Sequence, residues 1–334
     1  MELSDIYHKD IPEHIRLCSA LPEMQRLRSV GMNCGCEYTS FPLFLRLAPY
    51  SRYDHSVGCA LIVWHFTGSV AQSLAALFHD VATPTFAHVV DFLHGDHLVQ
   101  ESTEAKTGEI LRASPGLRPL LERYGLTAED VEDHHRWSIA DNDTPQLCAD
   151  RLEYTLGNLV NFGFGTPDDV RRLYGDIIAA PNEDGIDELC FRTPALGAEF
   201  AAFALRCSRI YVADPDRCAM QYLAELLRDA IREGILSPGL LMTDEQTVIR
   251  TLESDPAFAL RWAAFRSLSS TADKAPHYPW KRVIPAKKRY IDPYVAGKGR
   301  VSALFPALGE QLRFFTERSL LYEVSAGAAG DTPE

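Results

Sequence analysis

The stretch Ala75-Ala76-Leu77-Phe78-His79-Asp80, an apolar run that ends in a histidine and an aspartate, decides the fold. The dipeptide alone carries little information, because the chain has 11 His among its 334 residues. Two flanking segments strengthen it: Arg52-Tyr53-Asp54-His55-Ser56 before it and Asp150-Arg151-Leu152-Glu153-Tyr154 after it. Together, the imidazoles of His55 and His79 and the carboxylates of Asp80 and Asp150 would form a mixed nitrogen and oxygen shell. Such a shell suits Mn, Fe, Co, Ni or Zn, and Mg less well.

The spacing of the two histidines predicts a helical hairpin. In one straight helix His55 and His79 would lie about 36 Å apart, too far to share an ion. Gly68 is a natural helix end, and Ser69 with Gln72 three residues later is typical of a helix start. We therefore expect antiparallel helices over residues 56–66 and 70–80.

A third helix is expected to carry the fourth ligand. Thr144-Pro145 is typical of an N-cap followed by proline at the first helical position, which predicts a helix from there to about Phe162. On it Asp150, Tyr154 and Asn158 recur at every fourth residue, so that they share one face.

These segments resemble the HD superfamily of metal-dependent phosphohydrolases. The resemblance rests on Arg52-x-x-His55-Ser56, Leu77-Phe78-His79-Asp80-Val81, Pro84-x-Phe86-Ala87-His88 and Asp150-Arg151-x-Glu153-Tyr154, and covers roughly residues 20–165. Within the superfamily it is strongest to the deoxynucleoside triphosphate triphosphohydrolases, namely the bacterial dGTP triphosphohydrolases and the SAM-and-HD-domain dNTP hydrolase. Four positions depart from their pattern: Thr83, Gln100-Glu101, Asn158 and Met32-Asn33.

The resemblance implies a role for each matching position. His55, His79, Asp80 and Asp150 would hold the metal, and Asp150 would thereby also be catalytic. Arg52 and Arg151 would contact phosphates, Tyr154 would meet the sugar, and Asn158 stands where an acid near the sugar is usual. His88 would lie beside the reacting phosphorus, as a general acid or base, because an imidazole titrates near neutral pH.

The rest of the chain predicts an all-α fold, an HD-domain helical bundle with an additional C-terminal helical region and little β structure. Pro181-Asn182-Glu183-Asp184-Gly185 marks the boundary between a metal-binding helical domain at residues 1–180 and a helical region at residues 181–324. Residues 325–334 predict a flexible tail. Helices are expected, among others, at 84–94 after Thr83-Pro84 and at 127–135, and strands at 36–43 and 282–291.

Charge and composition restrict the partners. A net charge of −13 disfavours nucleic-acid binding. Against that background, residues 281–300 carry Lys281, Arg282, Lys287, Lys288, Arg289, Lys298 and Arg300 with Asp292 as the sole acid. This basic segment either folds over the site to hold phosphates or forms a solvated ribbon or an oligomer contact. The N-terminus lacks a signal-peptide pattern and there is no long apolar run, which predicts a cytoplasmic protein with no membrane contact and eight reduced cysteines.

Three functions remain open at this stage. The first is a metal-dependent phosphohydrolase acting on a nucleotide, most simply a nucleoside triphosphate or a related phosphate ester. The second is an HD-fold di-iron oxygenase, with His97 and either His134 or His135 as additional ligands. The third is a non-catalytic module that senses a nucleotide without turnover, which Thr83 and Gln100 suggest. For any of the three, the resemblance suggests a homo-oligomer, and an allosteric nucleotide site near Gln25 and Arg28 is a further expectation.

Overall fold

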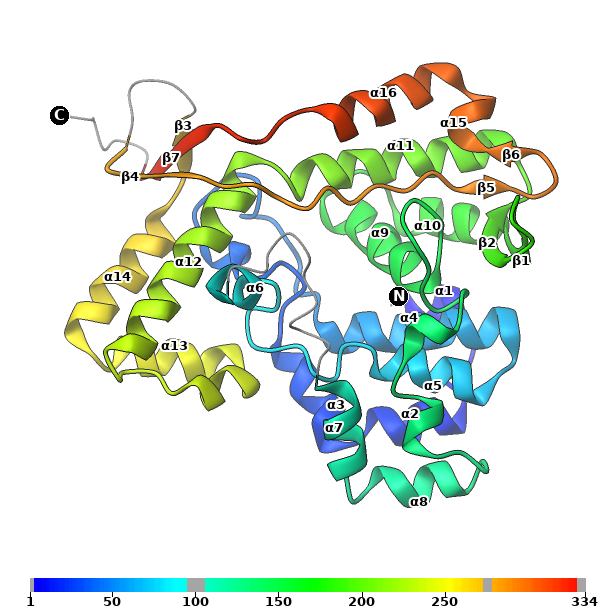
Figure 1. Cartoon of the computed structure of the whole chain (residues 1–334), viewed down its shortest axis with the longest axis horizontal. Coiled ribbons are helices and arrows are strands. Elements are labelled where there is room, and N and C mark those ends of the chain that lie inside the picture. The colour runs from blue at the N-terminus through cyan, green and yellow to red at the C-terminus, as the bar shows by residue number, and fades with distance from the viewer. Residues whose placement is uncertain (1–2, 95–105, 273–277, 329–334) are drawn as a thin grey trace.

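The computed structural model describes residues 3–94, 106–272 and 278–328 and is mainly helical with little strand, as expected (Figure 1). The α-helices are α1 Ser4–Tyr7, α2 Glu13–Ser19, α3 Pro22–Gln25, α4 Arg52–Thr67, α5 Val70–Phe78, α6 Val89–His94, α7 Thr107–Ala113, α8 Leu117–Glu122, α9 Ala149–Asn161, α10 Pro167–Tyr174, α11 Pro194–Ile210, α12 Asp214–Arg232, α13 Glu245–Glu253, α14 Pro256–Ser267, α15 Val301–Leu304 and α16 Pro306–Glu317. Short 3-10 helices are η1 Arg26–Ser29, η2 Cys36–Tyr38, η3 Ala128–Asp130, η4 His134–Arg136 and η5 Pro238–Met242.

The helical hairpin that the spacing of the two histidines predicts is present. Ser51 caps α4 in a reciprocal capping box with Asp54, and Gly68 ends the helix with a φ of 61°. Ser69 then caps α5 by accepting a hydrogen bond from the Gln72 N–H at 3.4 Å. The chain therefore reverses, and α4 and α5 pack side by side below the centre of the molecule (Figure 1).

Two predicted helix starts are wrong. The helix expected from Thr144-Pro145 begins at Ala149, because the Ala149 and Asp150 amides bond to the Ile139 and Ala140 carbonyls rather than to a helical turn. The helix expected from Thr83-Pro84 begins at Val89 as α6. Phe86 and Ala87 have positive φ values of 61° and 47°, which no right-handed helix contains.

The strands fall mostly where none was predicted. β1 (Ile177–Pro181) and β2 (Asp187–Phe191) form an antiparallel hairpin that continues through β5 (Tyr294–Val295) to β6 (Gly299–Arg300). β3 (Ser270–Ala272), β7 (Glu323–Gly327) and β4 (Trp280–Val283) form a second, antiparallel sheet. The turn of the first hairpin coincides with the predicted boundary after residue 180, and β7 includes residues 325–327 of the predicted tail.

Three further predictions of local structure are corrected. Residues 36–43 begin as the 3-10 helix η2 instead of a strand, and 127–135 hold η3 and the start of η4 instead of an α-helix. Of the strand expected at 282–291, β4 contains residues 282–283 and the remainder is irregular. Residues 329–334 of the tail lie outside the described chain.

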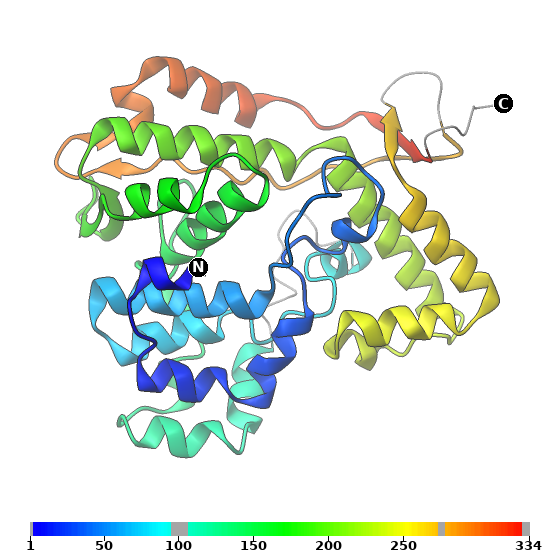
Figure 2. The same cartoon turned by 180° about the vertical axis from the view of Figure 1, so that it is seen from behind.

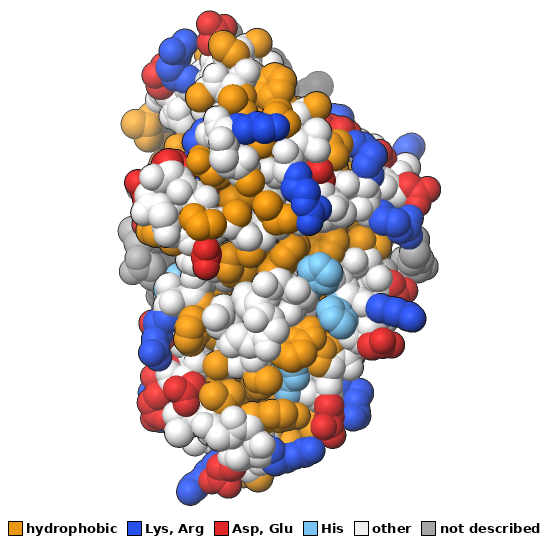
Figure 3. Space-filling view, turned by 90° about the vertical axis from the view of Figure 1, so that its right-hand side faces the viewer, with side chains coloured by type: hydrophobic (Ala, Val, Ile, Leu, Met, Phe, Trp, Pro, Cys, Tyr) orange, Lys and Arg blue, Asp and Glu red, His pale blue; other side chains and the backbone are white. Residues whose placement is uncertain are grey.

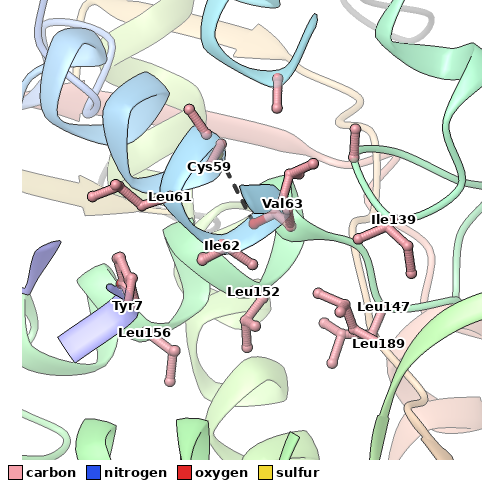
Figure 4. Close-up of a cluster of buried hydrophobic side chains, with 14 of the residues drawn as sticks. Tyr7, Cys59, Leu61, Ile62, Val63, Ile139, Leu147, Leu152, Leu156 and Leu189 are labelled. Atoms are coloured by element: carbon pink, nitrogen blue, oxygen red, sulfur yellow. Dashed lines mark hydrogen bonds between the residues drawn. The ribbon is translucent and has the colours of Figure 1, made fainter. Parts of the chain in front are cut away.

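Two hydrophobic clusters support the fold. One lies beneath α2, α4, α5, α9 and α11 and extends to β2 and α16. Figure 4 shows part of it, with Ile62 of α4 above Leu152 of α9. The other lies among α6, α12, α13 and α14 and reaches β4 and β7. Figure 2 shows the same two groups of helices from behind.

The surface has no face of a single charge sign in the view of Figure 3, where apolar side chains run along the middle and acidic and basic ones lie mainly toward the margins. None of the helices in the described part of the chain has the length and apolar character that a bilayer crossing requires.

Candidate active site

The four predicted metal ligands meet at one point. His55 comes from α4, His79 and Asp80 follow the end of α5, and Asp150 lies in the first turn of α9. The Nε2 atom of His55 lies 3.2 Å from Nε2 of His79, 2.9 Å from Oδ1 of Asp150 and 4.0 Å from Oδ2 of Asp80. Nε2 of His79 lies 3.5 Å from the same Asp80 oxygen and 3.7 Å from the Asp150 oxygen. Ligand atoms bound at about 2.1 Å to one ion are themselves about 3–4 Å apart.

The other ring nitrogens determine which atoms face this point. Nδ1 of His79 lies 2.7 Å from the carbonyl oxygen of Ala76, which accepts only if Nδ1 carries the proton. Nδ1 of His55 lies 2.5 Å from Oε2 of the buried Glu153 and donates to it in the same way. Both Nε2 atoms therefore present lone pairs to each other and to two carboxylates. This donor set fits a divalent cation, and hydrogen-bonded Nδ1 atoms are the usual support of metal-bound histidines.

Without a cation, a proton takes its place. Burial lowers the pKa of His55, but the adjacent Cys59 and the hydrogen bonds to Asp150 and Glu153 outweigh this effect and leave that pKa raised. Metal binding at His55 must then release a proton, as is general for histidine ligands.

Cys59 lies beside the cluster without being suited as a ligand. Its Sγ is equally distant, 3.7 Å, from both ring nitrogens of His55, so it does not lie along the Nε2 lone pair. Burial raises the pKa of the thiol to about 12, which keeps it protonated, whereas metals bind the thiolate. Asp80 is the more suitable fourth donor.

Arg52 holds Asp80 in place. Its Nη1 lies 2.9 Å from Oδ2 and 3.2 Å from Oδ1 of Asp80, while Thr83 donates to Oδ1 at 2.7 Å. Thr83, one of the positions that depart from the triphosphohydrolase pattern, thus orients a predicted metal ligand. The expected phosphate contact of Arg52 stays a prediction, although the guanidinium also lines the pocket.

The cluster lies at one wall of a cavity of about 1240 Å³ between the two hydrophobic clusters. Lys287, Lys288 and Arg289 of the basic segment line the cavity as well. Three of the other four cations of that segment pair with acids elsewhere: Arg282 with Glu225, Lys281 with Glu323 and Arg300 with Glu188. In the described chain, the cations of the basic segment that line the cavity are therefore those at its centre, residues 287–289.

His88 connects the basic segment to the opposite wall. Its Nδ1 lies 2.9 Å from Oδ2 of the fully buried Asp91, and its Nε2 lies 3.3 Å from Nη2 of Arg289. Burial and the Arg289 charge lower the pKa of His88 to about 4, against the partial compensation of Asp91. The imidazole is therefore neutral near pH 7, with its proton on Nδ1 toward Asp91 and a lone pair on Nε2. Its role as a general acid or base stays a prediction.

The three predicted substrate contacts on α9 differ in how far their polar atoms are already engaged by hydrogen bonds within the protein. Arg151 is bound to the loop before α9, with Nε donating to the Gln146 carbonyl at 2.8 Å and Nη1 3.3 Å from Asp141. Tyr154 and Asn158 line the cavity, and Asn158 donates to the Tyr211 hydroxyl at 2.8 Å. The Oδ1 atom of Asn158 is buried and has no hydrogen-bond partner among the described residues, so it can accept one from a ligand. The roles of all three stay predictions.

The motifs in the sequence did not predict a role for two residues that lie at the site. Glu153 was quoted in the motif around Asp150 without a function, although it supports His55. Asp216 lines the cavity from α12, and burial raises the pKa of its carboxyl to about 8. His97 and Gln100-Glu101 lie outside the described residues.

Comparisons with known proteins are consistent with this site. No family model matches the chain. It is 26% identical over 263 residues to the uncharacterized protein YdhJ of Bacillus subtilis, covering 76% of each chain. It is 28% identical over 194 residues to the metal-dependent phosphohydrolase cns2 of Cordyceps militaris, which covers 57% of this chain and 51% of the fungal protein.

A crystal structure of a hypothetical protein from Aquifex aeolicus superimposes with a TM-score of 0.60 at 16% identity, over 90% of this chain and 89% of that one. The chain thus has a fold already observed and is a distant homologue of a protein described as a metal-dependent phosphohydrolase.

Proposed function

We propose that this protein is a metal-dependent phosphohydrolase that acts on a nucleotide, with a nucleoside triphosphate or a related phosphate ester as substrate. One observation carries the proposal: lone pairs of two histidines and two carboxylates converge on one wall of a cavity that Lys287, Lys288 and Arg289 also line. Such a pocket offers a cation site and positive charge to the same anionic ligand. The fungal homologue's description supports the same reaction class.

In this mechanism the metal would activate the water molecule, and the protein would hold both the metal and the substrate. A bound divalent cation lowers the pKa of water and polarises a phosphoryl oxygen. His55, His79, Asp80 and Asp150 would hold it. Arg289 would bind the phosphate oxygens and neutralise charge that develops during the reaction. Lys287 and Lys288 would add positive charge nearby, with the Lys288 ammonium donating to the Thr316 and Arg318 carbonyls.

His88 is the base in this proposal. Its hydrogen bond to Asp91 fixes the proton on Nδ1 and leaves the Nε2 lone pair toward Arg289. When Arg289 turns to a phosphate, Nε2 becomes free to accept a proton, and the phosphate's negative charge raises the pKa of the imidazole. Asp91 then stabilises the imidazolium, as the buried acid does in other acid-base pairs.

The wall formed by Tyr154, Asn158 and Tyr211 would take the sugar. Tyr154 and Tyr211 meet edge to face with ring centroids 6.2 Å apart, and the unpaired Asn158 oxygen offers an acceptor to a hydroxyl. Asn158 stands where the triphosphohydrolases usually have an acid, so a preference for deoxyribose is not part of the proposal. The cationic residues favour hydrolysis of an anion over the oxygenase alternative.

A product analysis tests the proposal. The purified protein would be incubated with ribo- and deoxyribonucleoside mono-, di- and triphosphates, each with Mn, Mg, Fe or Ni, and the products separated by chromatography. We expect release of phosphate, pyrophosphate or triphosphate from one group of substrates, and loss of both turnover and bound metal in Asp150→Ala. Asp168→Ala, an exposed acid on α10, is the matched control and should retain both.

Absence of any product across the panel would overturn the proposal. If nucleotides nevertheless raised the melting temperature, the sensing alternative would take its place. Oxygen consumption by the iron-loaded protein would instead favour the oxygenase.

A further inference from the structure

A second group of metal-binding side chains lies next to the first. The loop between η3 and α9 brings η4 toward α5, where the ring centroids of His134 and His79 are 5.5 Å apart. His134, His135 and Asp141 each offer one donor atom, and these atoms lie within 4.8 Å of one another. Two imidazoles and a carboxylate are again a donor set for a transition metal.

The distances around Asp141 suit a shared ion. Its Oδ2 atom lies 2.8 Å from Nδ1 of His135 and 4.0 Å from Nε2 of His134. The longer separation lies at the upper end of the range of about 3–4 Å expected for atoms bound to one cation, and the shorter lies just below that range. The other oxygen, Oδ1, lies 3.3 Å from Nη1 of Arg151 and accepts from the Cys148 thiol at 3.3 Å. Arg151 therefore fixes the carboxylate while Oδ2 remains directed at the histidines.

Asp150 links this group to the first one. It supplies a donor atom to the cluster with His55 and His79, and it also lies within 4.8 Å, donor to donor, of Asp141 and Cys148. A carboxylate has two oxygens, so one aspartate can serve two ions. The two clusters border the same cavity.

We propose that His134, His135 and Asp141 form a second divalent transition-metal site, joined to the first through the carboxylate of Asp150. The inference rests on the proposed function only for the use of the second ion. Two-metal phosphatases hold their ions about 3.5–4 Å apart and neutralise both the attacking and the leaving oxygen. Arg151 acquires a positioning role in this arrangement, because it orients Asp141 instead of reaching a phosphate itself.

Metal stoichiometry tests the second site independently of activity. The full-length protein would be freed of metal, equilibrated with Mn or Zn, and its bound metal measured by elemental mass spectrometry. We expect about two equivalents per chain for the wild type and about one for His135→Gln or Asp141→Asn. The His135 side chain is 56% exposed, so its replacement leaves the core unchanged.

His65→Gln is the matched control, because His65 is an exposed histidine on α4 outside both clusters; it should keep two equivalents. With Mn, the wild type should also give the spin-coupled electron paramagnetic resonance signal of adjacent ions, and His135→Gln the signal of an isolated ion. Uptake of one equivalent by the wild type, or of two by His135→Gln, would overturn the second site and leave the proposed hydrolase intact. A wild-type protein that binds no metal would remove both proposals.

Discussion

Replacing Glu153 by glutamine should weaken metal binding without disturbing the fold. Glu153 is 2% exposed, and its Oε2 accepts hydrogen bonds from Nδ1 of His55 at 2.5 Å and from the Tyr50 hydroxyl. Tyr7 lies 3.5 Å from the other oxygen. The Gln side chain keeps the shape and one acceptor but loses the negative charge that increases the basicity of His55.

The magnitude follows from that single change. A hydrogen bond to a charged group contributes about 1.5–3 kcal/mol, and a neutral one about 0.5–1.5 kcal/mol. Their difference, about 1–1.5 kcal/mol, corresponds to a roughly five- to tenfold rise in the metal Kd. Replacements of groups that support metal-bound histidines cost about 10- to 100-fold, so about tenfold is the expected effect of Glu153→Gln.

A competition titration of the metal-free protein against a chromogenic chelator measures this Kd directly. Glu225→Gln is the control, since Glu225 accepts hydrogen bonds from Trp280 and Arg282 away from the cavity. An unchanged Kd in Glu153→Gln, or an equal rise in Glu225→Gln, would refute the role of Glu153 in orienting His55.

Three further changes test individual contacts. Arg289→Met removes a positive charge that disfavours protonation of His88, so the pKa of His88 should rise from about 4 by about one unit while burial still holds it below 6.5; a histidine NMR titration that shows no rise would contradict this. Asp216→Asn should stabilise the protein relative to the wild type, and increasingly so from pH 5 to pH 8. The pKa of the Asp216 carboxyl is raised to about 8 in the folded protein, so this group binds more protons in the folded than in the unfolded state, and the wild type loses stability as the pH rises through that window. A difference in melting temperature between variant and wild type that is the same at pH 5 and pH 8 would contradict this. Gly58→Ala would place a Cβ 2.6 Å from Cγ of Glu153, so denaturant unfolding should show a loss of about 1–3 kcal/mol, and full stability would mean that Glu153 moves freely.

The convergence of the four proposed ligands was predictable because local signals bracket them. Gly68 and Ser69 define the turn between α4 and α5. Residues 55–63 of α4 are buried without interruption, so neighbouring elements cover this helix on all sides. Once the hairpin is fixed, His55 and the His79-Asp80 pair can meet in few ways. The identity of Asp150 as the fourth ligand came from the resemblance and from the shared helix face.

Local signals failed where tertiary hydrogen bonds decide the backbone. Thr83-Pro84 and Thr144-Pro145 both have the composition of helix starts, yet neither segment is helical there. The Thr85 amide donates to the Leu241 carbonyl, and the Ala149 amide to the Ile139 carbonyl, across contacts that no short window of sequence contains. β1 and β2 were missed for a different reason: they pair with each other locally across the turn after Pro181, and that turn sequence was interpreted as a domain boundary.

The basic segment shows how the two hydrophobic clusters create the cavity together. Arg289 is 201 positions from His88 along the chain, yet their side chains lie 3.3 Å apart. The segment is held on both sides of this contact, by β4 pairing with β7 and by the Asp292 amide donating to the Pro145 carbonyl beside α9. Arg289 is thus fixed in space by residues of both halves of the chain, so a fragment ending at residue 180 would retain all four metal ligands and lack the cationic wall. Because that fragment would also lose α11 and α16 from the first hydrophobic cluster, the full-length Arg289→Met chain is the better test. It should bind metal as the wild type does but show a large loss of affinity for phosphate esters, which separates the contribution of the metal from that of the basic segment.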